Sequence, residues 1–386
     1  MNIRKGILTA QSCAKDPRAA AREFYEAVAQ PDMALVVFFC SSNYDLDVLA
    51  VEMDRLFTGV QVTGCTTAGE IGPAGYTDYS ITGASFPASE FTAVTGHIDH
   101  LQQFNTAKGQ DFAQAQLQRL ESKAPHAVPQ NSFAVLLIDG LSVREELVTR
   151  TLQNALGKLP LIGGSAGDGL DFGSTYVYFE GRFHPDSAVM IMISTSLPFR
   201  TFKIQHFVPT DERLVVTEVD TVHRIVKEIN GLPAAEEYAR LTGVDANDLD
   251  PMRFAASPVV VIIDGMNYVR SIQKANSDNS LTFFCAIEEG LVLRVARGVD
   301  MVANMEQSFA AIQDEIGPPQ LVIGCDCILR KLEILQSGLK DRVADVFRRY
   351  NAIGFNTYGE QFRGIHVNQT LTGIVIGTAV SEVRNA

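Results

Sequence analysis

The first residue that could do chemistry is the serine in Gly163-Gly164-Ser165-Ala166-Gly167. A G-x-S-x-G pattern is typical of a nucleophile elbow, where a sharp turn between a strand and a helix exposes a catalytic serine. The residues after Gly167 have the pattern of a loop and a strand, not of a helix. A serine hydrolase that uses Ser165, with Asp264 and His366 as partners in chain order, is therefore the less favoured hypothesis. We expect no enzymatic activity.

Cysteine offers a second kind of chemistry in Cys325-Asp326-Cys327. Structural zinc sites use four ligands in a recognisable spacing, and no second cysteine pair or histidine cluster accompanies this one. We expect buried thiols, and a redox role stays open because nearby Arg330 and Lys331 would lower a thiol pKa. Six cysteines in 386 residues are too few for a disulfide framework. They predict a reducing compartment, the cytoplasm.

Seven histidines could bind a metal or a haem. Four are predicted to be solvated surface residues: His97, His100, His126 and His184. His206 lies in an apolar strand pattern, His223 is predicted to open a helix, and His366 follows a glycine-containing loop near the C-terminus. These three are predicted to be interior or cleft residues. A lone histidine does not establish a metal site, so the alternatives stay open.

Composition excludes several classes of protein. The chain carries 32 basic and 45 acidic residues, a net charge of −13, and has no basic cluster, so nucleic acid is not an expected partner. Its longest apolar runs fall far short of the roughly 20 residues that span a bilayer. The N-terminus lacks the apolar stretch of a signal peptide. We expect a cytoplasmic protein without membrane insertion.

A recurring order of elements must position these side chains. Residues 18–29 and 45–57 have helical patterns, and the apolar run 34–39 and residues 60–63 are predicted strands. The order returns with strand 133–138, helix 143–156 and strand 160–162, and the interval from the first strand to the following glycine loop is 30 residues in both copies. A third copy has strand 321–323, helix 339–350 and loop 354–360. Residues 79–86 and 91–98 are predicted antiparallel strands.

The repeat predicts an α/β protein with two sheet-based domains, built from strand-helix-strand-loop-hairpin units with mixed sheets. We place the boundary at the Ser196-Leu197-Pro198 segment, which gives domains 1–197 and 198–386. Between the second and third copies, residues 199–209 and 213–219 are predicted strands, and residues 223–229 and 234–241 are predicted helices.

The loop after the second strand of each copy is the candidate ligand site. Loops 64–70 and 354–360 share the pattern G-x-x-T-x-G-E, and loop 163–168 is one residue shorter and ends in Asp168. Loops at the carboxyl ends of parallel strands usually build ligand crevices. The candidate ligand residues are Thr67, Glu70, Ser165, Asp168, Thr357 and Glu360. A purely structural role stays open, because threonine and glutamate can also bond backbone amides.

These loops carry a resemblance to a known family. Residues 62–71 and 161–168 resemble the N-terminal half of FIST proteins, a family of sensory and signal-transduction proteins, and residues 354–360 with 366–371 resemble the C-terminal half. Within the family, Phe38-Phe39-Cys40-Ser41-Ser42 and Gln205-His206-Phe207 are similar to haem-binding nitric oxide sensors of the NosP type. The resemblance covers nearly the whole chain and implies a non-enzymatic sensor.

The resemblance implies haem b as cofactor, nitric oxide as signal and a histidine kinase as the regulated partner. The haem would be non-covalent, since the chain has no C-x-x-C-H attachment motif. His206 is the predicted axial ligand, with His223 and His366 as alternatives. The other function compatible with the family is a haem-free receptor for a small metabolite such as an amino acid. Glu70, Asp168 and Glu360 would then face an amine, and Thr67, Ser165 and Thr357 would supply hydroxyls. A homo-oligomer stays open.

Overall fold

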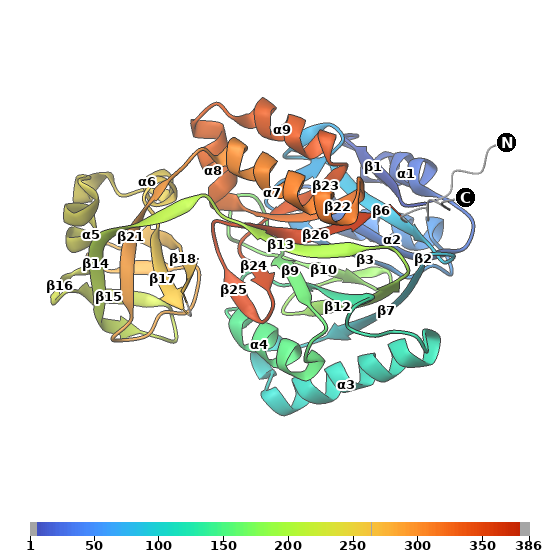
Figure 1. Ribbon diagram of the computed structural model, residues 1–386, viewed down its shortest axis with the longest axis horizontal. Helices are drawn as coiled ribbons and strands as arrows, with labels where there is room; N and C mark the ends of the chain where they lie inside the picture. Colours follow the sequence, from blue (N-terminus) through green and yellow to red (C-terminus); the bar gives the residue numbers. More distant parts are fainter. Residues whose placement is uncertain (1–5, 264, 379–386) are drawn as a thin grey trace, which may run out of the picture.

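Three copies of one structural unit build the body of the protein. The computed structural model describes residues 6–263 and 265–378. Within this range the strands form three six-stranded sheets and one eight-stranded sheet (Figure 1). The six-stranded sheets share one strand order, so we call their chain segments unit 1, unit 2 and unit 3. The eight-stranded sheet belongs to an insertion in unit 3.

Unit 1 begins near the N-terminus. Its elements are β1 (Leu8–Ser12), α1 (Pro17–Val28), β2 (Met33–Ser41), α2 (Leu46–Leu56), β3 (Val62–Thr67), β4 (Glu70–Gly72), β5 (Gly75–Thr77) and β6 (Ile81–Pro87). The Asp16 side chain accepts a hydrogen bond from the backbone N–H of Ala19 (2.8 Å), and Pro17 occupies the first turn, so α1 starts where the sequence predicts. The run from Leu35 to Ser41 in β2 is buried on both faces, because alternate side chains pack against the other sheets on one face and against α1 and α2 on the other.

Unit 2 repeats this order. Its elements are β7 (Phe91–Ile98), the 3₁₀ turn η1 (Leu101–Gln103), α3 (Thr106–Lys123), β8 (Ser132–Ile138), α4 (Glu145–Leu156), β9 (Leu161–Ser165), β10 (Val177–Phe179), β11 (Arg182–His184) and β12 (Ala188–Thr195). Strand β12 lies between β7 and β8 and is buried throughout.

Unit 3 has the same plan but is interrupted after its first strand. Its elements are β13 (Phe199–Ile204), α7 (Met301–Ile316), β22 (Pro319–Cys327), α8 (Ile328–Gln336), α9 (Lys340–Arg349), β23 (Ala352–Thr357), β24 (Glu360–Phe362), β25 (Ile365–Val367) and β26 (Leu371–Gly377). The insertion, residues 207–298, forms a separate lobe at the left of Figure 1. It contains β14 (Phe207–Asp220), β15 (Ile225–Ile229), β16 (Leu232–Pro233), α5 (Ala234–Thr242), η2 (Ala246–Asp248), α6 (Pro251–Ala256), β17 (Val259–Ile263), β18 (Met266–Arg270), β19 (Ile272–Ala275), β20 (Leu281–Phe283) and β21 (Val292–Gly298).

Each six-stranded sheet contains one parallel pair, and the units exchange their hairpins. The parallel pairs are β2–β3, β8–β9 and β22–β23, and helices join the two strands of each pair. Hairpin β10–β11 of unit 2 pairs with β3, hairpin β24–β25 of unit 3 pairs with β9, and hairpin β4–β5 of unit 1 pairs with β23. The exchange closes a cycle, so every sheet contains strands from two units.

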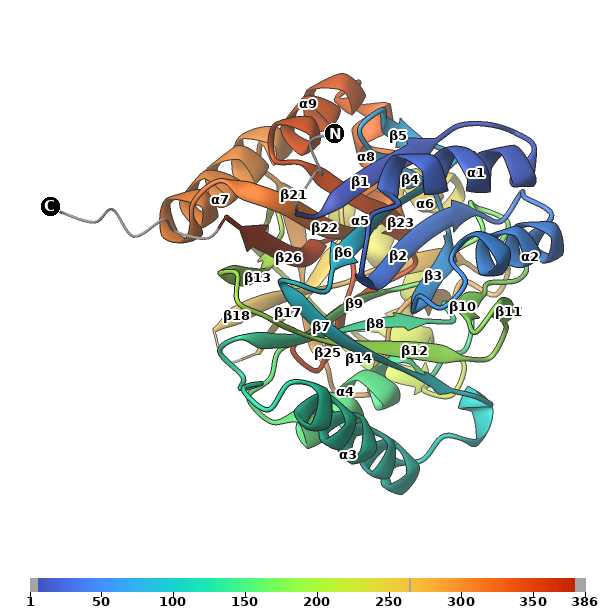
Figure 2. The ribbon, with the colours of Figure 1, turned by 90° about the vertical axis from the view of Figure 1, so that its right-hand side faces the viewer.

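A shared core lies where the three sheets face one another. Phe39 of unit 1 stacks on Phe355 of unit 3 with ring centroids 4.5 Å apart, and Val135 and Leu137 of unit 2 belong to the same buried cluster. Figure 2 shows the helices on the outside, with α1 and α2, α3 and α4, and α7 and α9 in three groups. Because the inner faces bury apolar area only against one another, we expect the units to fold together rather than separately.

The predicted mixed α/β fold from repeated units is confirmed. The helix predicted over residues 223–229 is wrong: residues 221–224 form a turn, and β15 follows as a strand between β14 and β20. The sequence pattern did not separate the insertion from unit 3. The predicted strands 79–86 and 91–98 correspond to β6 and β7, which lie in different sheets. The boundary after Leu197 lies in the connection between β12 and β13 and stays a prediction. No helix in the described part is long and apolar enough to cross a membrane.

Candidate functional site

The three glycine-containing loops meet at one end of the body. Each follows the second strand of a parallel pair, and backbone hydrogen bonds tie the loops together. The N–H of Ala68 donates to the carbonyl of Asn356 (2.9 Å), and the N–H of Gly167 donates to the carbonyl of Thr66 (3.0 Å). The N–H of Ser165 donates to the carbonyl of Gly359 (2.9 Å). The three candidate ligand loops therefore lie next to one another.

Glu70 and Glu360 hold their own hairpins and line none of the described cavities. One oxygen of Glu70 accepts from the backbone N–H and the hydroxyl of Ser80 (3.0 and 2.9 Å). One oxygen of Glu360 accepts from the same two groups of Thr370 (3.1 and 2.7 Å). Both carboxyl groups are fully buried, and burial raises the pKa of Glu70 to about 7 and raises that of Glu360 as well. Glu70 and Glu360 therefore have the structural role that the sequence left open, in which a loop glutamate accepts hydrogen bonds from backbone amides.

Asp168 is not the counterpart of these two glutamates. Glu70 stands opposite Phe355 and Glu360 opposite Gly164, whereas the residue in the equivalent place of unit 2 is Val177, opposite Cys65. The sequence pattern, which aligned Asp168 with Glu70 and Glu360, is therefore wrong at this position. The reason is that a longer loop separates Gly167 from β10 in unit 2. The Asp168 carboxylate instead holds this loop. It accepts from the N–H groups of residues 172, 173 and 174 and from the hydroxyl of Tyr358.

The hydroxyl groups of the three loops are engaged within the protein. Thr67 donates to Glu70 (2.5 Å), and Thr357 donates to the carbonyl of Ser165 (2.7 Å). Ser165 is fully buried, and its hydroxyl accepts from the side-chain amide of Gln361 (3.0 Å). Loop and strand follow Ser165, as predicted, so the helix of a nucleophile elbow is absent from residues 166–179. Asp264, the acid of the hydrolase hypothesis, lies outside the described residues.

A cavity of about 340 Å³ opens beside the converging loops. All three units line it: residues 41–43, 67–69 and 78 of unit 1, residues 168–171 of unit 2, and one face of α8 of unit 3. Of the predicted ligand residues, Thr67 and Asp168 lie in this lining, and Glu70, Ser165, Thr357 and Glu360 do not. The volume falls in the range of small-molecule sites.

Lys331 supplies the cation of this cavity. Its ammonium group donates to the carbonyl of Ala68 (2.8 Å) and pairs with Asp78. The Lys331 side chain is 10% exposed and the Asp78 side chain is 73% exposed, so the lysine is the fixed partner and the aspartate the solvated one. Leu170, Leu332 and Leu335 give apolar lining. The loop pattern G-x-x-T-x-G-E did not identify Lys331 as a residue of this cavity, because Lys331 comes from a helix outside the repeated motif.

The sequence matches two family models in succession. Residues 34–232 match the FIST N domain, and residues 234–363 match the FIST C domain. This chain belongs to the FIST family. FIST domains are sensory domains in signal transduction.

Other relatives of this FIST protein are distant. An uncharacterized protein of Methanocaldococcus jannaschii is 23% identical over 257 residues, which cover 56% of this chain and 48% of that protein, so the match spans about half the length of the curated relative. A cyanuric acid hydrolase from A. caulinodans has a TM-score of 0.31 at 8% identity, over 52% of this chain and 72% of its own. A chorismatase has a TM-score of 0.35 at 10% identity, over 95% of this chain and 99% of its own. Likeness at this level supports no conclusion about activity.

In the FIST protein His206 is buried where the chain leaves unit 3 for the insertion. Its Nε2 atom lies 2.8 Å from Glu333 Oε1, and its Nδ1 atom lies 3.0 Å from Arg330 Nη1. A haem iron would have to replace one of these partners, and His206 lines none of the described cavities. The described packing does not fit a haem at His206. Its role as axial ligand stays a prediction.

The two alternative histidines have different surroundings. His366 is buried, its Nδ1 atom lies 3.3 Å from the Gln361 amide, and burial lowers its pKa to about 4. His223 is exposed in the turn before β15, and its Nδ1 atom lies 2.7 Å from Asp220. It borders a cavity of about 120 Å³. This packing also does not fit a haem at either residue.

The remaining histidines and the cysteines complete the set of candidate ligands. His100 and His126 are exposed, as predicted. The prediction is wrong for His97 and His184, which are partly buried with ring centroids 4.5 Å apart, because hairpin β10–β11 folds over β7. All six cysteines are free, and burial raises the thiol pKa of both members of the C-x-C pair, so the expected buried thiols are confirmed. No group of three metal-ligating side chains occurs in the described residues.

Proposed function

We propose that this FIST protein is a non-enzymatic receptor for a small zwitterionic metabolite such as an amino acid, bound in the cavity between the three units. The observation that carries the proposal is the nearly buried ammonium group of Lys331, whose carboxylate partner Asp78 is solvated. A ligand carboxylate can take the place of Asp78 on Lys331. Asp78 and Asp171 at the rim can then receive the ligand ammonium, and the leucines contact its side chain.

Helix α8 provides a route from this cavity to the insertion. One face of the helix, with Lys331, Leu332 and Leu335, lines the cavity. Arg330 and Glu333 on the same helix hold His206 at the start of the insertion, and the N–H of Val299, where the chain returns, donates to the carbonyl of His206 (2.8 Å). A ligand that binds more tightly to one position of α8 would therefore shift the insertion. The insertion is then the surface read by a partner protein, for which we propose a histidine kinase.

Calorimetric titration with the protein amino acids tests the receptor proposal. We expect at least one to bind, with affinity reduced about 10-fold or more in Lys331→Met, because a charged hydrogen-bonding partner is lost. Lys340→Met, at an exposed lysine on α9, is the matched control and should bind as the wild type does. Leu335→Trp fills the cavity from its exposed rim and should also abolish binding. Absence of amino-acid binding, or full binding in both cavity variants, would overturn the proposal.

Haem-based nitric oxide sensing is the second candidate, supported by the similarity of residues 38–42 and 205–207 to NosP-type sensors. The packing around His206, His223 and His366 does not fit a haem, so this candidate requires one of these side chains to exchange its present hydrogen-bond partner for the iron. The test is the absorption spectrum after incubation with haem b. A Soret band that shifts with nitric oxide and is lost in His206→Ala, His223→Ala or His366→Ala would favour this candidate and identify the ligand. For either candidate we propose a cytoplasmic protein, in agreement with its free thiols.

A further inference from the structure

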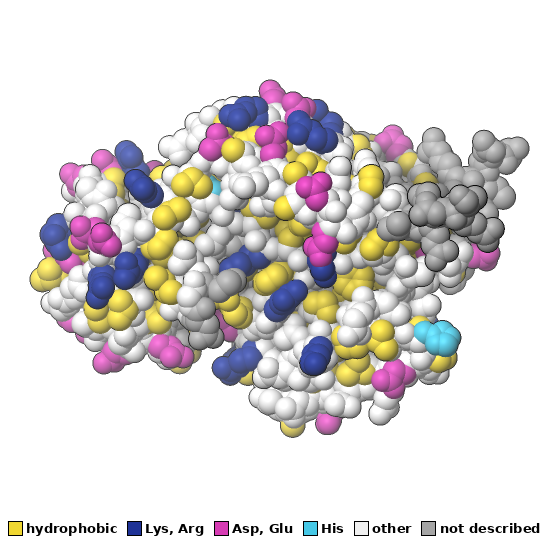
Figure 3. Space-filling model, viewed as in Figure 1, with side chains coloured by type: hydrophobic (Ala, Val, Ile, Leu, Met, Phe, Trp, Pro, Cys, Tyr) yellow, Lys and Arg dark blue, Asp and Glu magenta, His cyan; other side chains and the backbone are white. Residues whose placement is uncertain are grey.

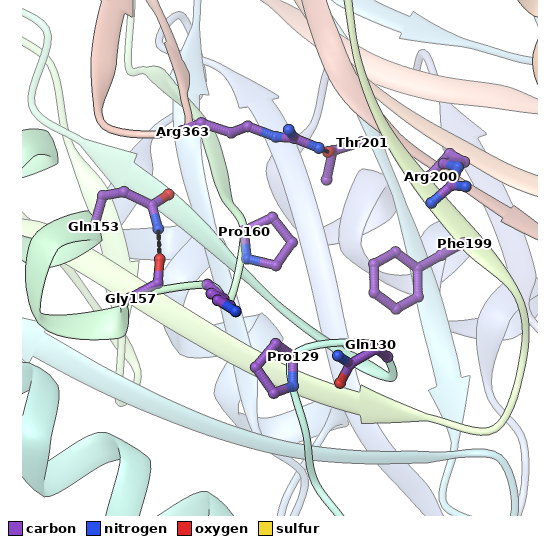
Figure 4. A pocket seen from close by; sticks show the side chains of 10 residues that line it. Pro129, Gln130, Gln153, Gly157, Pro160, Phe199, Arg200, Thr201 and Arg363 are labelled. Carbon is purple, nitrogen blue, oxygen red and sulfur yellow. Dashed lines mark hydrogen bonds between the residues drawn. The ribbon is translucent and has the colours of Figure 1, made fainter.

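We propose a second binding site, for a small organic phosphate with a flat ring, in the cleft between unit 2 and unit 3 (Figure 4). The cleft has a volume of about 530 Å³. It lies at the end of the body opposite the first cavity, because Pro129 and Pro160 in its lining precede β8 and β9, whereas the converging loops follow the parallel strands. The two sites are therefore spatially separate and share no lining residue.

Three cations surround the cleft. Lys158 comes from the connection between α4 and β9, Arg200 from β13 and Arg363 from the turn between β24 and β25. In Figure 4 Arg363 extends toward Thr201 on one side and Arg200 stands on the other. Among the residues that the structure describes, no aspartate or glutamate lines the cleft, although the chain has a net charge of −13. Lys and Arg side chains also gather over the middle of the face drawn in Figure 3.

Two of these cations lack a carboxylate partner. Arg200 pairs with Glu315 of α7, whereas neither Lys158 nor Arg363 forms an ion pair within residues 6–263 and 265–378. The guanidinium group of Arg363 lies over the Phe362 ring, 5.4 Å from its centroid, and forms one long hydrogen bond to the Thr201 hydroxyl (3.4 Å), so its other donors remain available. Guanidinium and ammonium groups that converge on one cleft match the oxygens of a phosphate group.

The positive charge is specific to this cleft and does not follow from the repeated fold. The equivalent groove between unit 1 and unit 2 is built from the connection between α2 and β3, from β7 and from the turn between β10 and β11, with a volume of about 370 Å³. Its lining also includes Arg119 and Lys123 of α3, and Asp54 and Glu180 offset these two cations. This groove is thus an internal control of matched architecture.

Apolar groups give the cleft a place for the organic part of the ligand. The ring of Phe199 packs against Phe133 with centroids 4.9 Å apart, which holds it in the wall. Figure 4 shows Phe199, Pro129 and Pro160 around the same opening. A flat ring can lie on these side chains while its phosphate contacts Arg363 and Lys158. A nucleoside monophosphate has this combination of groups.

The test is calorimetric titration of the full chain with AMP and, separately, with inorganic phosphate. We expect AMP to bind more tightly than phosphate, and its affinity to fall at least about 10-fold in Lys158→Gln/Arg363→Gln. Arg119→Gln/Lys123→Gln, with the same charge change in the equivalent groove, should bind AMP as the wild type does. All four side chains lie at the surface, and circular dichroism checks that both variants are folded.

Three results would overturn this proposal. They are no binding of AMP, an equal loss of affinity in both double variants, and equal affinity for AMP and phosphate. The last result would remove the organic part of the assigned ligand. Leu335→Trp, which blocks the first cavity, should leave AMP binding unchanged, so failure of one site is distinguishable from failure of the other.

Discussion

His206 and Arg330 meet inside the protein with Nδ1 and Nη1 3.0 Å apart, although one immediately precedes the insertion and the other lies on α8. Arg330 also donates through Nε to Asp326 (2.7 Å), and Asp326 accepts from the hydroxyl of Tyr76 (2.5 Å). Arg330 and Asp326 are fully buried. A continuous polar network thus joins unit 1, unit 3 and the start of the insertion.

Arg330→Met should destabilise the protein strongly. The substitution leaves Asp326 buried without its cation, and breaking a buried ion pair in this way costs about 3–5 kcal/mol of unfolding free energy. Chemical denaturation measures this difference. Arg342→Met removes an exposed arginine from α9 and should change the unfolding free energy by less than about 0.5 kcal/mol. Similar stabilities of the two variants would contradict a central role for the network.

His366 should make the stability depend on pH. Its folded-state pKa of about 4 lies below the ordinary value of about 6.5, so the unfolded chain binds the extra proton between these values. The contribution is complete above about pH 6.5 and is lost as the pH falls toward 4, by about 3 kcal/mol in total. Denaturation at pH 7 and pH 5 should show a larger loss for the wild type than for His366→Gln. Equal losses of unfolding free energy in the two proteins would mean that a group other than His366 determines the pH dependence between pH 5 and pH 7.

The hydroxyl groups that hold the buried glutamates should contribute similarly in unit 1 and unit 3. Ser80→Ala and Thr370→Val each remove a donor to a buried carboxyl group and should lower the unfolding free energy by about 1–3 kcal/mol. Ser187 occupies the equivalent place in unit 2, but its hydroxyl has only a 3.4 Å contact with Asp99, so Ser187→Ala should have a smaller effect. A similar loss of unfolding free energy in all three variants would show that the hydrogen bonds to the buried glutamates do not cause the loss.

Gly167→Ala should disturb the junction of the loops. A β-carbon at this position would lie 2.7 Å from the backbone nitrogen of Ala68, in the neighbouring unit. We expect a loss of about 1–3 kcal/mol in thermal or chemical unfolding, because the backbones must move apart. Gly173→Ala, in the same loop of unit 2, places its β-carbon at an ordinary 3.5 Å from Asp168 and is the matched control. Equal tolerance of both changes would contradict close packing at the junction.

Local sequence patterns predicted most of the helices and strands in the repeated units. The Asp16-Pro17 pair starts α1, and the apolar run of β2 forms a buried strand, because capping and continuous burial depend on neighbouring residues. Residues 223–229 show the limit of this approach. Their spacing fits a helix as well as a strand, and only pairing with β14 and β20 selects the strand.

The ligand site shows the same division. Loop composition identified three loops that the structure brings together, and Thr67 and Asp168 line the cavity, whereas the other four candidate residues do not. The pattern G-x-x-T-x-G-E could not distinguish a glutamate that faces a ligand from one that holds a hairpin, since both need the same residue types. Lys331 lies far from these loops in sequence, and a helix of unit 3 brings it to Ala68 of unit 1.

The sequence by itself determined the family, the mixed α/β class and the repeated unit. It also determined that the chain is acidic and has few cysteines. These properties follow from composition, short-range periodicity and motifs. Only the tertiary structure decided that the units exchange hairpins in a cycle, that residues 207–298 form an insertion, and that Lys158, Arg200 and Arg363 share one cleft. Such features depend on contacts between residues far apart along the chain, and local pattern carries no information about which distant strands pair.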